Sequence, residues 1–215
     1  MDPSVVSSMH ALDQRDDLRA VVLVEGSSDR VALETLAALR GRDLEAEGVA
    51  VLAMGGATSI GRFLDLLGDR RYALRLAGLC DARERPAFRR ALERAGLGAT
   101  MSDSDMEALG FHVCVEDLED ELIRALGAPR VEELLEAEGE LRSFRILQQQ
   151  PAQQGRSAQR QLRRFMGTRS GRKAHFARVL VEALADDQVP RPLEQVLADV
   201  GEGGPPDAPG HAPPH

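Results

Sequence analysis

The sequence contains no tryptophan, and only 3% of its 215 residues are aromatic. Proteins that stack nucleobases usually present aromatic side chains, so this scarcity argues against an aromatic base-binding platform. The sequence also has only two cysteines, Cys80 and Cys114, and neither has histidine partners at the spacing of a zinc site. We therefore interpret both cysteines as buried thiols in a reducing compartment.

Long apolar runs are missing as well. No segment approaches the ~20 consecutive apolar residues that a membrane-spanning helix needs, and the opening residues Asp2 and Pro3 do not begin a secretory signal. These absences predict a cytoplasmic protein without a membrane partner. The hydrophobic fraction of 43% is still large enough for a packed core. The oligomeric state stays open.

Lysine is almost missing, because 26 of the 27 basic residues are arginine and Lys173 is the single lysine. In a chain with such a bias, a position that needs only positive charge would tend to become arginine. Lysine differs by presenting a compact ammonium group whose pKa can be shifted. This contrast favours a chemical role for Lys173, with chance placement as the alternative.

Charge is distributed unevenly along the chain. The net charge of −8 argues against binding nucleic acid by bulk attraction. However, residues 102–140 contain thirteen acids and two arginines, whereas residues 142–173 contain nine basic residues and no acid. This separation predicts an acidic region that holds metal beside a basic region that meets phosphate. Solvated helix faces are the alternative explanation.

Four apolar segments, at residues 20–25, 49–54, 74–80 and 111–115, have the character of buried strands. Segments with apolar residues at helical spacing separate them, and residues 130–200 are typical of further helices. Alternation of this kind predicts an α/β fold, with a parallel sheet covered by helices on both faces and a helical C-terminal extension.

We divide the chain accordingly into four parts. Residues 1–18 are expected to form an irregular lead-in, and residues 19–127 an α/β domain. Residues 128–200 are expected to form a helical extension packed on that domain. The last part, 201–215, is rich in glycine and proline and is expected to be a disordered tail.

Acidic residues follow two of the predicted strands, Glu25 after the first and Asp81 after the third. The carboxyl ends of parallel strands meet at one edge of a sheet, where sites in open α/β folds form. Carboxylate oxygens are the ligands that Mg²⁺ prefers. The sequence therefore predicts a Mg²⁺ site at this edge, with helix capping as the alternative role of these acids.

The order of the motifs resembles that of a TOPRIM domain, the metal-dependent catalytic fold of topoisomerases, bacterial primases and several nucleases. More narrowly, it is similar to the C-terminal half of the overcoming-lysogenization-defect (OLD) nucleases, over about residues 19–197. The motifs are Val24-Glu25-Gly26-Ser27-Ser28-Asp29, Met54-Gly55-Gly56, Leu79-Cys80-Asp81, Asp117-Leu118-Glu119 and Gly171-Arg172-Lys173.

The resemblance implies a set of roles. It implies Glu25 and Lys173 as catalytic residues, and Mg²⁺ or Mn²⁺, in two ions, as the cofactor. The implied metal ligands are Glu25, Asp29, Asp81, Glu119 and the substitute Glu84. The residues expected to bind phosphate or nucleic acid, from the resemblance and from the basic segment, are Gly55, Gly56, Arg83, Arg163, Arg164 and Arg172.

Two features depart from the family pattern. After the third strand the family has an acid, any residue and a second acid, whereas this chain has Asp81-Ala82-Arg83-Glu84. Either Glu84 replaces the second acid, or Arg83 contacts phosphate, or the second ion binds weakly. The chain also has no Gly-x-x-x-x-Gly-Lys-[Ser/Thr] phosphate loop. We therefore expect the TOPRIM part alone, working with a separate ATPase subunit or without nucleotide.

The function expected from this sequence is metal-dependent hydrolysis or transfer at phosphodiesters, most directly by a DNA endonuclease. A non-catalytic phosphate- or nucleic-acid-binding partner of a separate ATPase is one alternative. A nucleotidyl transferase or hydrolase that acts on small nucleotides is another. The choice between DNA and RNA, the cleavage selectivity and the pathway stay open.

Overall fold

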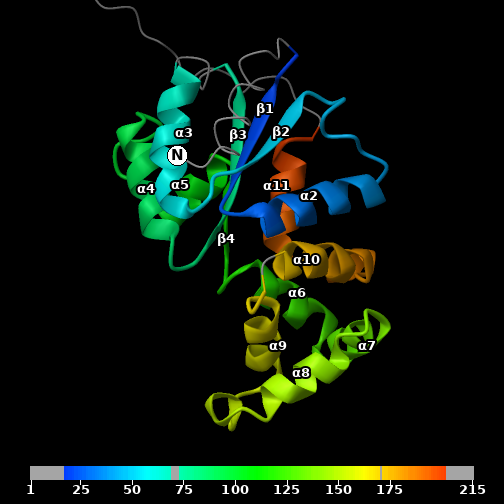
Figure 1. The fold of residues 1–215 in the computed structure, drawn as a ribbon. Helices are drawn as coiled ribbons and strands as arrows, with labels where there is room; N and C mark the ends of the chain where they lie inside the picture. The colour runs from blue at the N-terminus through cyan, green and yellow to red at the C-terminus, as the bar shows by residue number, and fades with distance from the viewer. Residues whose placement is uncertain (1–16, 69–72, 170, 202–215) are drawn as a thin grey trace, which may run out of the picture.

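The computed structural model describes residues 17–68, 73–169 and 171–201. A parallel sheet in the order β2-β1-β3-β4 forms its centre (Figure 1). The predicted parallel sheet is therefore confirmed. The expected lead-in up to residue 16 and the expected tail from residue 202 lie outside the described residues. The strands are β1 (Ala20–Val24), β2 (Val49–Ala53), β3 (Arg75–Asp81) and β4 (Phe111–Cys114).

Strand β1 is buried on both faces. Val22 and Val24 belong to the apolar core on one side of the sheet, and Val21 and Leu23 belong to the core on the other side. Successive side chains of a strand point to opposite faces, so an unbroken apolar run is what a central parallel strand requires. This burial fixes the position at which β1 ends and the loop after it begins.

Three helices cover one face of the sheet: α3 (Ile60–Leu67), α4 (Arg85–Arg94) and α5 (Asp103–Ala108) (Figure 1). A short 3₁₀ turn, Ala57–Ser59, leads into α3. Helix α5 was not predicted from the sequence, although its start carries a capping signal. The Ser102 hydroxyl accepts a hydrogen bond from the Asp105 amide at 3.1 Å.

Helices α2 (Ser27–Leu39), α10 (Arg172–Glu182) and α11 (Arg191–Asp199) cover the other face. Buried side chains such as Leu33, Phe176 and Leu197 join them to the sheet. A 3₁₀ turn at Asp186–Gln188 lies between α10 and α11. The chain thus returns from its helical part to close the core formed by its first strand.

Four helices lie beyond the carboxyl end of β4 (Figure 1). Phe144 and Phe165 pack edge to face between two of them, with ring centroids 5.4 Å apart. No helix in the described part of the chain is long and apolar enough to cross a membrane. The four helices are α6 (Leu118–Leu126), α7 (Ala128–Ala137), α8 (Leu141–Gln148) and α9 (Ala158–Met166). Helices α7 to α11 lie within residues 128–200, which were expected to form a helical extension, whereas α6 lies within the expected α/β domain of residues 19–127.

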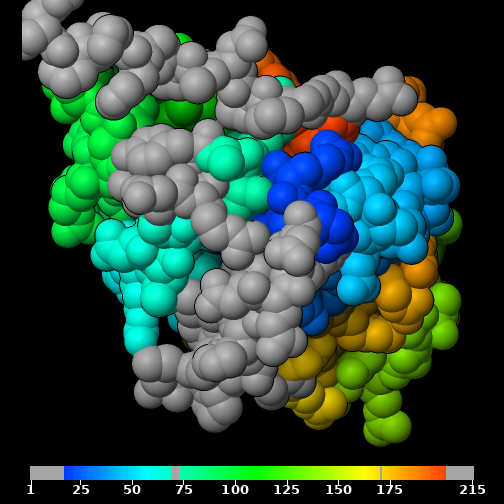
Figure 2. Space-filling view, turned by 90° about the horizontal axis from the view of Figure 1, so that it is seen from above, coloured from blue at the N-terminus to red at the C-terminus, as the bar shows by residue number. Residues whose placement is uncertain are grey.

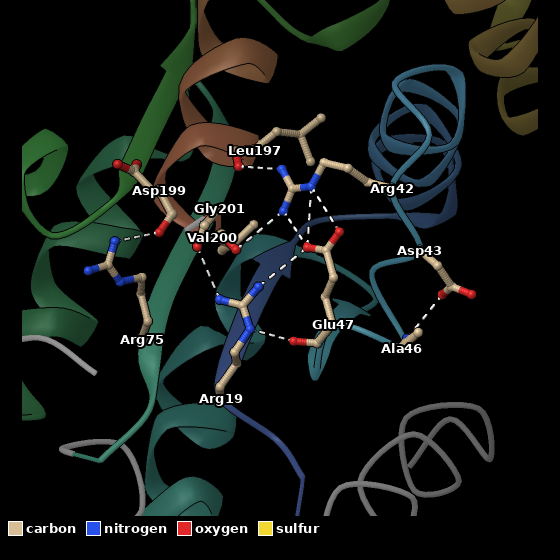
Figure 3. A network of polar contacts seen from close by, with 10 residues as sticks. All are labelled: Arg19, Arg42, Asp43, Ala46, Glu47, Arg75, Leu197, Asp199, Val200 and Gly201. Carbon is tan, nitrogen blue, oxygen red and sulfur yellow. Dashed lines mark hydrogen bonds and ion pairs between the residues drawn. The ribbon is translucent and has the colours of Figure 1, made fainter. Parts of the chain in front are cut away.

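The amino ends of the strands form the opposite edge of the sheet. Viewed from above, the blue start of β1 lies between the aquamarine start of β3 and the light-blue residues that precede β2 (Figure 2). Here the end of α11 meets the sheet (Figure 3). Arg42 donates to the Leu197 carbonyl at 2.8 Å, and Arg75 donates to the Asp199 carbonyl at 2.7 Å. These arginines satisfy carbonyls that have no partner within a helix end.

Candidate functional site

Two acids follow β1 directly. The Glu25 carboxylate reaches across to the next strand, where Oε1 accepts a hydrogen bond from the Asp81 amide at 2.8 Å. Asp29 lies in the first turn of α2, and its Oδ2 accepts from the Gly26 amide at 2.8 Å. Because β1 and β3 are paired neighbours, Glu25 and Asp81 meet at the carboxyl edge of the sheet, as the strand pattern requires.

The first turn of α6 supplies a further acid to this edge. Asp117 caps the helix, because its Oδ1 accepts from the Asp120 amide at 2.9 Å. The cap directs Glu119 inward, and this side chain is only 3% exposed. Glu119 Oε2 accepts from Lys173 Nζ at 3.0 Å, while the buried Oε1 atom has no hydrogen-bond partner within the described residues.

A cavity of about 470 Å³, which we call the acidic cavity, gathers most of the predicted residues. Loops after β1, β2 and β3, together with α6 and α10, contribute to its wall. The sequence-predicted residues that line it are Glu25, Asp29, Gly55, Gly56, Asp81, Glu119 and Lys173. Residues that lie up to about 150 positions apart in the sequence are therefore neighbours here.

Burial and neighbouring acids disfavour the ionised form of three carboxylates of the acidic cavity, those of Glu25, Asp29 and Asp81. Burial, and then the charges of Glu119 and Glu25, raise the pKa of Asp29 to about 7. Burial, and then the charges of Glu25 and Asp117, raise the pKa of Asp81 to about 8. Burial also raises the pKa of Glu25. Ionisation of these carboxyls in the metal-free site is therefore unfavourable, and a bound cation would favour it.

Lys173 contributes a positive charge to the acidic cavity. Burial acts to lower its pKa, but the nearby acids, above all Glu119 and then Asp117 and Asp29, together outweigh burial and raise it. The residue lies in the first turn of α10, where the helix dipole disfavours a cation. Its contact with Glu119 compensates for that position and keeps the ammonium group protonated beside the carboxylates.

The donor set of the acidic cavity fits a hard divalent cation. As the side chains stand, no three histidine, cysteine or acidic residues of the described chain are grouped closely enough to hold a metal ion by themselves. Mg²⁺, however, usually takes only one or two carboxylates and keeps several waters. The partnerless oxygen of Glu119 and the crowded carboxylates are what a bound cation would satisfy.

A second hollow of about 850 Å³, the arginine groove, adjoins the acidic cavity, and both are lined by Gly167 and Lys173. It runs along α9. Four of its arginines have no ion pair with any described residue, so their guanidinium groups are available to an anion. These are Arg83, Arg156, Arg160 and Arg164.

Two other arginines that were predicted to contact phosphate, Arg163 and Arg172, are paired with acids. Arg163 lines the groove, but its Nε donates to Asp117 Oδ2 at 2.5 Å and its Nη1 to Glu116 at 3.3 Å. The structure opposes the prediction for Arg172. That side chain is buried, and its Nη2 lies 3.1 Å from both carboxylate oxygens of Glu140. Arg172 therefore braces the start of α10 instead of facing a substrate.

Glu84 lies beside the cavity and does not line it. It precedes α4 and is partly buried, and its charge contributes to the raised pKa of Glu25. Sequence reasoning did not single out Arg156 and Arg160. Arg160 is four residues before Arg164 on α9, and Arg156 precedes that helix; the four-residue spacing was the available signal.

The fold and its acidic edge define a class, the α/β TOPRIM-type fold with a helical extension. Within that class, residues 18–82 match the family model described as "Overcoming lysogenization defect protein-like, TOPRIM domain". That segment runs from before β1 to just after Asp81, and it includes Glu25 and Asp29.

Solved structures of OLD proteins share the fold. The C-terminal region of the Xanthomonas campestris pv. campestris OLD protein is 24% identical with a TM-score of 0.62, over 85% of this chain and 94% of that chain. The C-terminal region of the Burkholderia pseudomallei OLD protein is 21% identical with a TM-score of 0.59, over 85% and 96%. A search of curated proteins found no match. The predicted resemblance and fold class are confirmed.

Proposed function

We propose that this protein is a metal-dependent phosphodiester hydrolase of the TOPRIM type that acts as a DNA endonuclease. A TOPRIM domain of OLD type implies metal-dependent processing of nucleic acid. The observation that carries the finer proposal is the junction at Lys173, where the acidic cavity meets a groove with four arginines that pair with no acid in the described part of the chain. Carboxylates for metal and guanidinium groups for phosphate thus form one continuous surface.

Glu25, Asp29, Asp81 and Glu119 would hold Mg²⁺ or Mn²⁺. Because such an ion uses one or two carboxylates, four carboxylates are enough for the two ions of the proposal. When bound, the ions supply a water of lowered pKa and neutralise charge on the phosphate. The buried oxygen of Glu119 and the raised pKa values of Asp29 and Asp81 support this assignment.

The protein's own groups then have distinct tasks. The Glu25 carboxylate accepts a hydrogen bond from the Asp81 amide, and burial raises its pKa, which makes it a better proton acceptor. Lys173 places a positive charge between the carboxylates and the groove, beside the position of the reacting phosphate. Arg160 and Arg164 hold the remaining phosphates of the strand.

The groove favours a polymer over a small nucleotide, since four arginines without an ion pair among the described residues line a hollow of about 850 Å³ that continues beyond the acidic cavity. Arg83 belongs to this set, so we assign it to phosphate and not to metal. The same proposal addresses the need for a separate ATPase subunit. Cleavage by the chain alone, without nucleotide, would show that such a subunit is unnecessary.

The test is incubation of supercoiled plasmid with the protein in Mg²⁺, in Mn²⁺ and in EDTA. We expect nicking or linearisation that requires metal and that disappears in Glu25→Gln and Lys173→Met. Arg178→Ala, which changes an exposed arginine paired with Glu182 on the outer part of α10, is the matched control and should keep full activity.

Three outcomes would contradict the proposal in different ways. Absence of cleavage by a folded wild type with either metal would favour the non-catalytic partner subunit. Hydrolysis of dinucleotides without cleavage of plasmid would favour the small-nucleotide enzyme. Equal activity of Glu25→Gln and wild type would remove the assigned site.

A further inference from the structure

Helix α9 holds the first turn of α6 by two hydrogen bonds. Arg163 Nε donates to Asp117 Oδ2 at 2.5 Å, and Gln159 Nε2 donates to Asp120 Oδ1 at 2.7 Å. Gln159 and Arg163 are four residues apart on α9, so they lie on the same face of that helix. The two helices are also in contact (Figure 1). The start of α6 is therefore fixed to the helix that lines the arginine groove.

The two residues that accept these bonds flank Glu119 in the sequence. Asp117 is the cap of α6, Asp120 lies in its first turn, and Glu119 lies between them. All three residues are buried. Glu119 Oε2 accepts from Lys173, while its Oε1 has no partner within the described residues. The position of Glu119 in the acidic cavity therefore depends on the helix turn that carries it.

Both oxygens of the Asp117 carboxylate take part in this arrangement. Oδ1 accepts from the Asp120 amide at 2.9 Å and caps α6, and Oδ2 accepts from Arg163. The Nη1 group of Arg163 donates in addition to Glu116 at 3.3 Å. Two acids thus balance the charge of Arg163. The next residue, Arg164, is exposed and has no ion pair with any described residue.

We propose that Arg163 is a positioning residue, which acts through Asp117 to hold Glu119 at the metal site, and that it does not contact phosphate. This inference rests on the proposed function, because it requires Glu119 to bind metal. Residues that orient metal ligands alter metal affinity when they are changed, although they do not touch the ion. Adjacent residues of α9 then have different tasks, since Arg163 serves the metal site and Arg164 the phosphate strand.

The direction of the change in metal affinity separates positioning from charge. Removing a positive charge near a cation site strengthens cation binding, because the repulsion between the two charges is lost. Removing a positioning residue weakens cation binding, because Glu119 is no longer held in place. Arg163→Gln should therefore weaken metal binding if Arg163 positions Glu119, and should not weaken it if Arg163 contributes charge alone.

The direct test is binding of Mn²⁺ to the full chain without DNA, followed by electron paramagnetic resonance. We expect Arg163→Gln to weaken Mn²⁺ binding by about tenfold or more, the effect typical of residues that orient metal ligands. Arg163→Lys should weaken it less, because an ammonium group can still pair with Asp117, and it gives the same comparison if the glutamine variant does not fold. Arg164→Gln removes the same charge from the adjacent residue. It is the matched control and should not weaken Mn²⁺ binding.

DNA binding with Ca²⁺ at several salt concentrations gives the reverse pattern. Arg164→Gln should reduce the slope of log K against log salt by about 1, as expected for one lost phosphate contact. Arg163→Gln should leave this slope unchanged. A slope reduced by about 1 in Arg163→Gln would make Arg163 a phosphate contact and overturn the inference.

Mn²⁺ binding by Arg163→Gln that is as tight as wild type, or tighter, would also overturn the positioning role. If the effect of Arg163→Gln is the same in an Asp117→Asn background, the route through Asp117 is excluded. The two proposals fail separately. Plasmid cleavage by wild type with unchanged Mn²⁺ affinity in Arg163→Gln removes only the positioning role. Weakened Mn²⁺ binding in that variant, without any cleavage by wild type, removes only the nuclease.

Discussion

Asp29 illustrates at the residue scale how burial and charge combine. Its carboxylate is 8% exposed and its pKa is about 7, against 3.8 for an exposed aspartate. Because the folded pKa is raised, the unfolded chain loses this proton first. The free energy of unfolding of the metal-free protein should therefore fall as pH rises from about 4 to about 7.

We predict that Asp29→Asn stabilises the metal-free protein at pH 8 but not at pH 4. One pKa unit corresponds to about 1.4 kcal/mol, which sets an upper limit of about 4 kcal/mol. We expect a gain of about 2 kcal/mol, since neighbouring acids adjust their protonation. Urea unfolding in EDTA across this pH range measures the difference. Asp65→Asn, at an exposed position of α3, is the control, and a gain that does not depend on pH would contradict the charge argument.

Arg172 shows at the same scale that adjacent residues can have unrelated tasks. Its guanidinium lies 4.1 Å from the Phe165 ring centroid and pairs with Glu140, whereas Lys173 points to the acidic cavity. Arg172→Met should lower the free energy of unfolding by about 2 kcal/mol, because the buried guanidinium loses its hydrogen bonds to Glu140 and Thr168 and its contact with the Phe165 ring. Chemical denaturation measures this. The prediction fails if stability is unchanged and only DNA affinity falls.

Helix α9 places arginines of the basic segment, residues 142–173, in the wall of the arginine groove. Arg160 and Arg164 of this helix line the arginine groove together with Arg156, which precedes the helix, while Leu162 and Phe165 are buried. An amphipathic helix of this kind separates the charged side chains from the core. The net charge of −8 therefore does not describe the surface that a phosphate strand would meet.

We predict that the double variant Arg160→Ala, Arg164→Ala weakens DNA binding and makes it less sensitive to salt. Each lost phosphate contact should reduce the slope of log K against log salt by about 1. Fluorescence anisotropy with Ca²⁺ at several NaCl concentrations measures both quantities. The matched control changes Arg90 and Arg94, which have the same spacing on the exposed side of α4. Equal slopes in both double variants would exclude the groove as the binding surface.

At the scale of the whole molecule, hydrogen bonds join helix α11 and the residues after it to the amino edge of the sheet (Figure 3). Arg42 pairs with Glu47 at 2.7 Å and also donates to the carbonyls of Leu197 and Val200. Arg19 adds a bond to the Gly201 carbonyl at 3.1 Å. These contacts lie at the edge opposite the acidic cavity, so they serve stability and not chemistry.

We predict that Arg42→Ala lowers the free energy of unfolding by about 2 kcal/mol, because several hydrogen bonds to a charged group are lost together. Plasmid cleavage at a temperature well below unfolding should be unaffected. Arg178→Ala, which breaks one exposed pair, should cost no more than about 0.5 kcal/mol. Thermal and urea unfolding compare the two variants. A cost for Arg42→Ala as small as that of the control would contradict the proposed closure.

The sequence by itself determined the parallel sheet and the positions of Glu25 and Asp81, because strand ends and turn residues are local signals. It also singled out Lys173 and Glu119. Only the tertiary structure decided that Lys173 meets Glu119, since they lie on different helices and their distance depends on packing. Packing likewise buried Arg172 and left Arg160 free. Burial and pairing are properties of the folded molecule, and a spacing in the sequence does not specify them.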